Sequence, residues 1–368
     1  MSKNFSYLDE MIHGGEEEIV LECDIILDNT EEMKYLEGID LDVDDIVIDG
    51  NGFSIDARGR TRIFLCSGEN LTIRNIVFKN GFARESGGAI MLEGGEVVLE
   101  EARFSFNSCG EDGGAIHNDE GSLTVRKCEF SDNNAGDFGG AINNWGDLAI
   151  IGSVFKENKA NYGGVLFNAG DLNVKESVFS LNNANRGAVI YNEDGDLTIC
   201  ESSFNDNVAS ECGGAIINRN CDMSISKSIF NANRANDGGA VHTTGEVRVI
   251  ESSFEDNVAS SNGGAIFAGR ADLAVKDCEF SGNAAGGNGG SLYAYDGEAS
   301  VLKSLFKANK ADFGGAFSNV KNVIDISDSE FIDNLANESG GAIYLEKSDC
   351  EASDLAFSEN KPDDVFEK

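Results

Sequence analysis

The sequence contains very little proline, histidine or tryptophan. Its 368 residues include one Pro (Pro362), one Trp and three His, against 44 Gly and 23 Phe. Disordered chains are usually rich in proline and poor in aromatic residues. A nearly proline-free chain with 41% hydrophobic residues is therefore not of that class. The composition indicates a folded protein with a large apolar core.

Positive charge is also scarce. The chain has only 28 Lys and Arg residues but 65 Asp and Glu residues, which gives a formal net charge of −37. A field of this sign repels phosphates and anionic lipids, so nucleic acid is not expected as a partner. No apolar run approaches the ~18 residues of a membrane span, so no membrane insertion is expected. The first residues lack the basic and apolar regions of a secretory signal, which favours a cytoplasmic location by default.

The cysteine spacing gives no sign of a disulfide framework or a zinc site. Nine cysteines are present, but they form no Cys-x-x-Cys pair and no Cys/His spacing typical of a zinc site. An odd number of irregularly spaced cysteines favours reduced thiols over disulfides.

A repeat of 24 to 26 residues runs through most of the chain. A small-residue signal, usually Gly-Gly-Ala-Ile, begins at Gly87, Gly113, Gly139, Gly163, Gly187, Gly213, Gly238, Gly263, Gly289, Gly314 and Gly340. A second signal, Phe-x-x-Asn, follows each one by 16 or 17 residues, at Phe104, Phe130, Phe155, Phe179, Phe204, Phe230, Phe254, Phe280, Phe306, Phe331 and Phe357. Eleven pairs in register establish a solenoid repeat.

Each repeat predicts three short strands. Between the two signals lies a stretch of alternating polarity, such as Asp-Leu-Asn-Val at 171–174, which is typical of a strand. No segment has a helical period long enough for a strand–helix repeat. The pattern predicts an all-β, right-handed parallel β-helix with about 25 residues per coil, in which stacked strands lie ~4.8 Å apart.

Residues one repeat apart are expected to stack in columns. The apolar residue that ends the first signal and the Phe of the second should point inward. Two positions before all but the last Phe stands a small residue, mostly Ser, and Cys128 and Cys278 occupy this column as buried small residues. Stacked asparagines, such as Asn118, Asn144 and Asn168, are expected to satisfy turns and to bond along the ladder.

Both ends depart from the repeat. Phe5, Leu8, Met11 and Ile12 share one face at helical spacing, which predicts a short helix that caps the first coil. We assign 1–45 to this cap and the first strands, 46–86 to irregular entry coils, 87–360 to eleven regular coils and 361–368 to a tail, all within one β-helix domain, 1–368. No cap is evident at the C-terminal end. That end is therefore expected either to pack against another molecule, for example in self-association, or to mark a truncated chain.

The paired signals, as at 139–142 and 155–158, resemble the repeat of chlamydial polymorphic membrane proteins and of the related adhesin-like proteins of methanogenic archaea. The run from Ile48 to Asp56 is similar to the entry coil of pectate-lyase-like β-helix proteins. The resemblance covers about residues 46–360 and implies an adhesive or surface-displayed β-helix at the cell surface. The sequence departs from it in having neither a signal peptide nor a membrane barrel or wall anchor.

The same resemblance also admits a polysaccharide lyase- or hydrolase-like enzyme. Hydrolases of this fold carry Gly-His-Gly and Arg-Ile-Lys motifs, and neither occurs here. His13, His117 and His242 lie coils apart and cannot share one site. The even spacing leaves no room for an inserted loop among the regular coils. A catalytic site would therefore have to lie in the first 82 residues, near Asp44, Asp45, Asp49 and Asp56.

Carboxylates recur at one position of the repeat, and seven of them lie in consecutive coils. The column contains Glu96, Asp147, Asp171, Asp196, Asp222, Glu246, Asp272, Glu298 and Asp349. Such residues can cap backbone amides in turns. Alternatively they hold cations, because like charges this close repel by about 1 kcal/mol even in water-like dielectric. Hard oxygen ligands favour Ca²⁺ or Mg²⁺. This second interpretation predicts weak Ca²⁺ binding at Asp147, Asp171, Asp196, Asp222, Glu246 and Asp272, with no other cofactor.

An aromatic column directly follows the inward apolar column. Alternation along a strand directs it outward, and a line of exposed aromatics is typical of a binding surface. Alternatively, loops cover this face or the phase is inverted. The candidate binding residues are Phe167, Tyr191, Phe267 and Tyr293. We therefore expect a non-enzymatic, adhesin-like or structural β-helix that presents repeated surfaces to an unknown protein or glycan.

Overall fold

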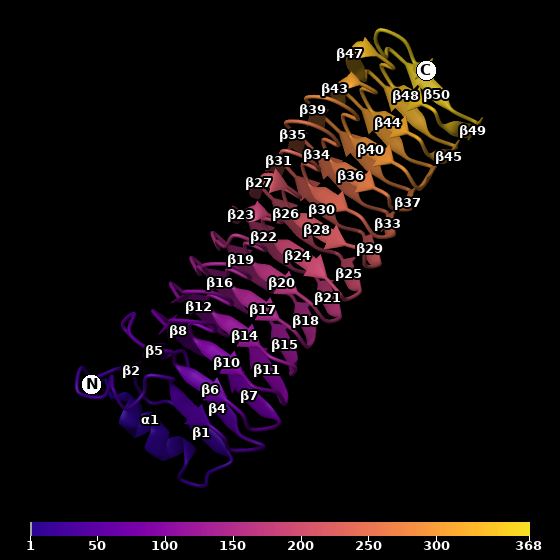
Figure 1. Cartoon of the computed structure of the whole chain (residues 1–368). Helices are drawn as coiled ribbons and strands as arrows, with labels where there is room; N and C mark the ends of the chain where they lie inside the picture. Colours follow the sequence, from indigo (N-terminus) through magenta and orange to yellow (C-terminus); the bar gives the residue numbers. More distant parts are fainter. Residues whose placement is uncertain (1) are drawn as a thin grey trace. The chain divides into compact units, whose positions relative to one another are not determined.

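The computed structural model describes residues 2–368 and contains one short helix and many short strands that pair in parallel (Figure 1). The chain divides into two compact units, Met1–Ala184 and Asn185–Lys368. The division falls inside the regular repeats and not at any boundary expected from the sequence. Both units are built from the same coil, which confirms the predicted parallel β-helix.

Helix α1 (Phe5–Ile12) confirms the predicted N-terminal cap. The Asn4 side chain accepts a hydrogen bond from the Tyr7 backbone N–H at 3.2 Å, which satisfies a donor that the first helical turn leaves free. Phe5, Leu8 and Ile12 are fully buried. The helix thereby covers the first coil, which would otherwise expose its core and strand edges.

Three sheets of the first unit supply the sides of the coil. Sheet A contains β2 (Ile25–Ile26), β5 (Ser54–Asp56), β8 (Val77–Lys79), β12 (Arg103–Ser105), β16 (Glu129–Ser131), β19 (Val154–Lys156) and β22 (Val178–Ser180). Sheet B contains β1 (Glu18–Val20), β4 (Val47–Asp49), β7 (Leu71–Arg74), β11 (Glu96–Glu100), β15 (Ser122–Arg126), β18 (Asp147–Ile151) and β21 (Leu172–Lys175). Sheet C contains β3 (Ile39–Leu41), β6 (Phe64–Cys66), β10 (Ile90–Leu92), β14 (Ile116–Asn118), β17 (Ile142–Asn144) and β20 (Leu166–Asn168).

The second unit repeats the arrangement. Its strands of sheet A are β26 (Ser203–Asn205), β30 (Ile229–Asn231), β34 (Ser253–Glu255), β38 (Glu279–Ser281), β42 (Leu305–Lys307), β46 (Glu330–Ile332) and β50 (Ala356–Ser358). Those of sheet B are β25 (Leu197–Cys200), β29 (Met223–Ser226), β33 (Val247–Ile250), β37 (Leu273–Lys276), β41 (Glu298–Leu302), β45 (Val323–Ser327) and β49 (Asp349–Ser353). Those of sheet C are β24 (Ile190–Glu193), β28 (Ile216–Arg219), β32 (Val241–Thr243), β36 (Ile266–Gly269), β40 (Leu292–Tyr295), β44 (Phe317–Val320), β48 (Ile343–Glu346) and β51 (Val365–Glu367).

A fourth strand, which the sequence pattern did not predict, follows sheet A in many coils. In the first unit β9 (Phe82–Ala83) pairs with β13 (Ser108–Cys109). In the second unit this sheet D contains β27 (Val208–Cys212), β31 (Arg234–Ala235), β35 (Val258–Ala259), β39 (Ala284–Ala285), β43 (Lys310–Phe313) and β47 (Leu335–Ser339). Strand β23 (Asn183–Arg186) spans the division between the units. These strands carry no alternating apolar pattern, which is why the sequence did not reveal them.

The predicted inward columns are confirmed. Ile116 pairs with Ile142 on sheet C, and Phe130 pairs with Phe155 on sheet A. These side chains are fully buried, and the Phe130 and Phe155 rings stack with centroids 4.7 Å apart. In the second unit Phe230 stacks on Phe254 at the same separation. A continuous ring stack of this kind buries a large apolar area in every coil.

Polar ladders run through the same core. The Asn133 carboxamide accepts hydrogen bonds from the Asn107 backbone N–H (3.1 Å) and Nδ2 (3.0 Å), and donates to the Phe104 carbonyl (3.0 Å) and Asn158 Oδ1 (3.0 Å). The second set of stacked asparagines, Asn118, Asn144 and Asn168, also forms side-chain hydrogen bonds from coil to coil, as predicted. In the small-residue column, the Cys128 backbone N–H donates to Ser153 Oγ at 3.1 Å, and all nine cysteines are free thiols.

The glycine pair has two separate requirements. Gly139 has φ +63°, a left-handed backbone that disfavours other residues. A Cβ added at Gly140 would lie 2.1 Å from the Gly164 carbonyl of the next coil. The first glycine makes the turn and the second permits close stacking.

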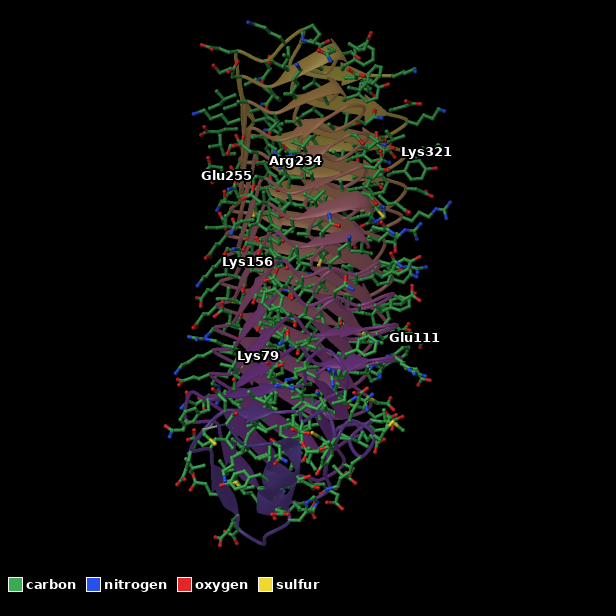
Figure 2. The ribbon with its side chains drawn as sticks, turned by 90° about the vertical axis from the view of Figure 1, so that its left-hand side faces the viewer. Lys79, Glu111, Lys156, Arg234, Glu255 and Lys321 are labelled. Atoms are coloured by element: carbon green, nitrogen blue, oxygen red, sulfur yellow. The ribbon has the colours of Figure 1, made fainter. Side chains whose placement is uncertain are left out.

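The last coil is more exposed than the others. Every residue of β49 is exposed, and Phe357 is only half-buried. Strand β51, which pairs with β48, lies in the segment that the sequence assigned to a tail. Elsewhere, long charged side chains such as Lys79 and Lys156 project from the ribbon (Figure 2).

Candidate binding surfaces

The predicted aromatic binding column is less exposed than expected. Phe167 in the first unit and Tyr191 in the second unit are only 5% and 3% exposed, whereas Phe267 and Tyr293 are half-buried. The prediction of an exposed line is therefore wrong at Phe167 and Tyr191. In some coils the residue just before the Gly-Gly turn packs on the outer face of sheet C. Phe138, for example, packs edge-on against Phe167 with ring centroids 4.7 Å apart.

Within the second unit, two members of the column belong to a short stack. The His242 imidazole lies parallel to the Phe267 ring at 4.6 Å, and the Phe267 ring lies 5.2 Å from that of Tyr293. Burial lowers the pKa of His242, so the imidazole is neutral at pH 7. Because Phe267 and Tyr293 keep part of their surface exposed, they remain candidate binding residues.

An aromatic cluster in the first unit contains a residue that column analysis missed. Trp145 lies in the turn between β17 and β18 and is 52% exposed. Its ring centroid is 5.7 Å from that of Phe167, which contacts Phe138, and Phe138 stacks on Tyr162 at 5.0 Å. We call these four residues the Trp145 cluster. Trp145 is the only tryptophan, and the residue type at its repeat position varies from coil to coil, so only its rarity could have drawn attention to it.

The acidic column begins the strands of sheet B. In the first unit, Ser122 pairs with Asp147, and the Leu148 N–H donates to the Asp171 carbonyl at 2.9 Å, which places Asp147 and Asp171 one coil apart. A shallow depression of about 210 Å³ is lined by both aspartates together with Thr124 and Asn173. In the second unit a similar depression of about 370 Å³ includes Glu246, Asp272 and Glu298.

Several carboxylates of this column already have partners. The Asp272 carboxylate accepts a hydrogen bond from the Glu298 backbone N–H at 3.0 Å, and Glu246 pairs with Arg248 at 2.5 Å. Among residues 2–368, no three His, Cys, Asp or Glu side chains converge closely enough to hold a metal ion. Any Ca²⁺ along the column would therefore have at most two protein carboxylates, and the predicted weak binding stays a prediction.

Three side chains of the regular coils with potential catalytic chemistry, His117, Cys128 and Ser153, are half-buried or fully buried. Burial lowers the pKa of His117 and raises the pKa of the Cys128 thiol to about 12, so the imidazole is neutral and the thiol protonated at pH 7. Ser153 donates to the Ile151 carbonyl at 3.1 Å. These side chains are engaged in packing and in ladders, and none has the charge and exposure of an activated nucleophile.

One cleft lies among the irregular entry coils. It measures about 480 Å³ and is lined by Glu32, Leu36, Glu37, Gly59, Arg60, Arg62, Phe82, Ala83, Arg84 and Glu85. Arg62 is 7% exposed and donates to the carbonyls of Gly87 (2.9 Å) and Ser86 (2.8 Å). Arg60 and Arg62 pair with Glu32 and Glu37 across 3.4 and 3.3 Å. The charges of the cleft largely neutralise one another.

The four aspartates near which a catalytic site was expected, Asp44, Asp45, Asp49 and Asp56, do not line this cleft. Asp49 pairs with Arg74 at 2.9 Å, and Asp56 accepts a hydrogen bond from Asn80 at 2.9 Å. The Asp44 and Asp45 carboxylates accept hydrogen bonds from neighbouring residues one coil on, each at 2.9 Å. All four stabilise the corners of the entry coils.

Comparisons with known proteins agree with this architecture. Residues 61–230 match the family model described as the right-handed beta helix region, and residues 251–269, 277–295 and 328–346 match that of the Chlamydia polymorphic membrane protein repeat. No significant match to the chain is found among curated proteins. No helix within residues 2–368 is long and apolar enough to cross a membrane. By fold, the chain is a right-handed parallel β-helix protein, and part of its repeat matches that of the Chlamydia polymorphic membrane proteins.

Proposed function

We propose that the protein is a non-enzymatic, adhesin-like recognition β-helix whose coils present repeated surfaces to a protein or glycan partner. The outer face of sheet B carries this proposal. In the second unit its central column runs through Thr198, Ser224, Arg248, Ala274 and Ser300, and these side chains are exposed or half-buried. Unlike the outer face of sheet C, this face is polar and open to solvent, and Arg248, Ala274 and Ser300 help to line the shallow depression of about 370 Å³.

The distribution of reactive groups supports binding over catalysis. Enzymes place acids, bases and nucleophiles in one concave site with perturbed pKa values. Here the half-buried His117 and His242 lie in separate coils, the small-residue column is hydrogen-bonded internally, and the depressions on sheet B are shallow. A polysaccharide lyase- or hydrolase-like activity is the competing function, and the cleft of the entry coils is the place where it would reside.

Three further properties belong to the same proposal. The kinship of the repeat with polymorphic membrane proteins favours display at a cell surface. The exposed strands of the last coil favour self-association or contact with another molecule, because unpaired strand edges template pairing. Weak Ca²⁺ binding along the acidic column would reduce repulsion between successive carboxylates.

The test compares binding with turnover. The full chain is incubated with panels of neutral and acidic oligosaccharides and with surface-exposed proteins, while bound ligand and released reducing ends or unsaturated sugars are measured. We expect saturable binding with every ligand recovered intact. Product that accumulates in proportion to the protein would refute the non-enzymatic function.

A paired variant locates the binding face. Thr198→Arg with Ser224→Arg adds two long side chains to the outer face of sheet B and should abolish binding. Asn205→Arg with Asn231→Arg makes the same change on sheet A in adjacent coils and should have no effect. Full binding by the sheet B variant would refute the assignment to this face.

A further inference from the structure

Trp145 has no cation over its ring, in contrast to two tyrosines on the same side of the coil in the second unit. At the equivalent turn of the second unit stands Tyr295, and Lys321 of the next coil places Nζ 5.3 Å from its ring centroid. Tyr191 is likewise covered by Arg219, whose guanidinium lies 6.0 Å from the ring centroid. Among residues 2–368, no Lys or Arg covers the Trp145 indole, although indole is the best cation–π acceptor.

The residues that occupy the neighbouring coils explain this difference. The backbone N–H groups of Asp119, Trp145 and Ala169 each donate to the preceding coil at 2.9 Å, so the three residues stand at the same turn position in successive coils. Ala169 is small and uncharged, and Asp119 is acidic and exposed. Neither neighbour at this turn position can therefore place a cation on the indole, and one of them carries a carboxylate.

The turn holds Trp145 in a fixed position. The Asn144 side chain accepts a hydrogen bond from Asn118 Nδ2 (2.6 Å). It donates hydrogen bonds to Asn168 Oδ1 (2.8 Å) and to the Gly146 carbonyl, which closes the turn. Asn118, Asn144 and Asn168 are fully buried. Below the indole lies Phe167, itself fixed by the edge of Phe138. A half-exposed ring on such a support loses little conformational entropy on binding.

Negative charge surrounds the indole. Asp147 follows Trp145 by two residues, is exposed, and has no cationic partner among residues 2–368. Asp119 lies one coil away, ~4.8 Å along the stack, and is likewise without a cationic partner in that range. The depression that Asp147 shares with Asp171 begins directly beside the turn. The net charge of −37 steers cationic partners toward the chain and repels anionic ones.

From these observations we infer that the Trp145 cluster is a recognition site for a basic segment of a protein partner. A Lys or Arg side chain of the partner covers the indole, as Lys321 covers Tyr295 within the chain. A second basic side chain reaches the carboxylates of Asp119 and Asp147. The geometry suits an organic cation and not a metal ion, because the carboxylates are spaced along the stack and do not converge. This inference rests on the proposed recognition function and names its partner class.

Trp145 fluorescence provides the direct test, because it is the only tryptophan. The full chain is titrated with a synthetic peptide of alternating Arg and Gly, with the corresponding Glu–Gly peptide, and with cellohexaose as a neutral glycan. We expect a saturable change of emission with the Arg–Gly peptide alone, weakened by added salt. A response to cellohexaose without one to the Arg–Gly peptide would overturn the inference in favour of a glycan site.

Variants separate the site from general attraction to an acidic surface. By calorimetry, Trp145→Leu should weaken binding of the Arg–Gly peptide by about 3- to 30-fold, the usual range for a lost cation–π contact. Phe106→Leu is the matched control: Phe106 is 62% exposed, lies in the same unit outside the cluster, and should leave binding unchanged. Asp147→Asn should weaken binding about 2- to 5-fold, whereas Asp132→Asn, at an exposed corner after β16 in the same unit, should not.

Equal affinity of Trp145→Leu and the unaltered chain would overturn the inference. That result would leave the recognition function standing if the panel experiment still finds an intact bound ligand. If the panel experiment instead finds turnover, the recognition function fails whatever the Trp145 variants show. Trp145→Leu should keep the circular dichroism and melting temperature of the parent, because the side chain is half-exposed.

Discussion

Two asparagines of one coil, Asn133 and Asn143, are predicted to respond to the same substitution with opposite sign. Both are buried, with 0% and 1% of their surface exposed. The Asn133 carboxamide makes four hydrogen bonds within its ladder. Neither polar atom of the Asn143 carboxamide has a partner among residues 2–368. Leucine, which also branches at Cγ, removes the polar atoms in each case and keeps an apolar side chain of similar shape.

The expected magnitudes follow from these contacts. Asn133→Leu loses four hydrogen bonds at about 0.5–1.5 kcal/mol each and leaves the Asn107 N–H without its acceptor, so the free energy of unfolding should fall by about 2–6 kcal/mol. Asn143→Leu removes an amide that is desolvated without compensation and should raise the free energy of unfolding by about 1–3 kcal/mol. Ile217 occupies the equivalent position in the second unit and is also buried, so an apolar residue fits there.

Urea unfolding monitored by Trp145 emission measures both effects, because Trp145 lies in the same coil and reports its loss directly. Far-UV circular dichroism gives the transition of the whole chain and shows whether one coil opens before the rest. Equal destabilisation by the two substitutions would refute the reasoning, since it would mean that burial alone, and not hydrogen-bond satisfaction, determines the cost.

Three other perturbations have defined outcomes. Phe230→Ala breaks the ring stack in the second unit and should lower the free energy of unfolding by about 3–5 kcal/mol, measured by urea denaturation. Burial lowers the pKa of His242 below its ordinary value of 6.5, so the folded protein is destabilised as pH falls below 6.5 and the unfolded chain takes up a proton more readily. His242→Phe should therefore reduce the loss of stability between about pH 7 and 5, measured by thermal melts. If the acidic column binds Ca²⁺, millimolar Ca²⁺ should raise the melting temperature above that in chelator, and an unchanged value would remove the ion from the proposal.

Repetition explains why the fold could be predicted from one sequence. A single Gly-Gly pair or a single Phe is weak evidence, but each column repeats the same physical requirement many times. The left-handed turn at Gly139 and the close approach at Gly140 recur in nearly every coil, as does a fully buried Phe. The terminal helix was predictable for a different reason, because Phe5, Leu8 and Ile12 follow the helical period.

The exposure of the aromatic column could not be predicted in the same way. Alternation along a strand determines which face of the sheet a side chain occupies, but not what packs on that face. Phe138, which buries Phe167, lies in a segment without strand periodicity. The sheet D strands lie in similar segments. Whether the outer face of sheet C is covered depends on tertiary packing, which the alternation of residues along a strand does not predict.

Function in this architecture is expected at the positions that the ladders leave free to vary. The buried amides of Asn118, Asn144 and Asn168 fix the turn backbone in three successive coils, yet the next residue is in turn Asp119, Trp145 and Ala169. Because the backbone is held by the preceding asparagine, the exposed residue that follows can change without a cost to folding. A uniform core therefore permits coil-specific surfaces, and the residue that breaks the repeat most conspicuously, the single tryptophan, is also the one whose surroundings favour a ligand.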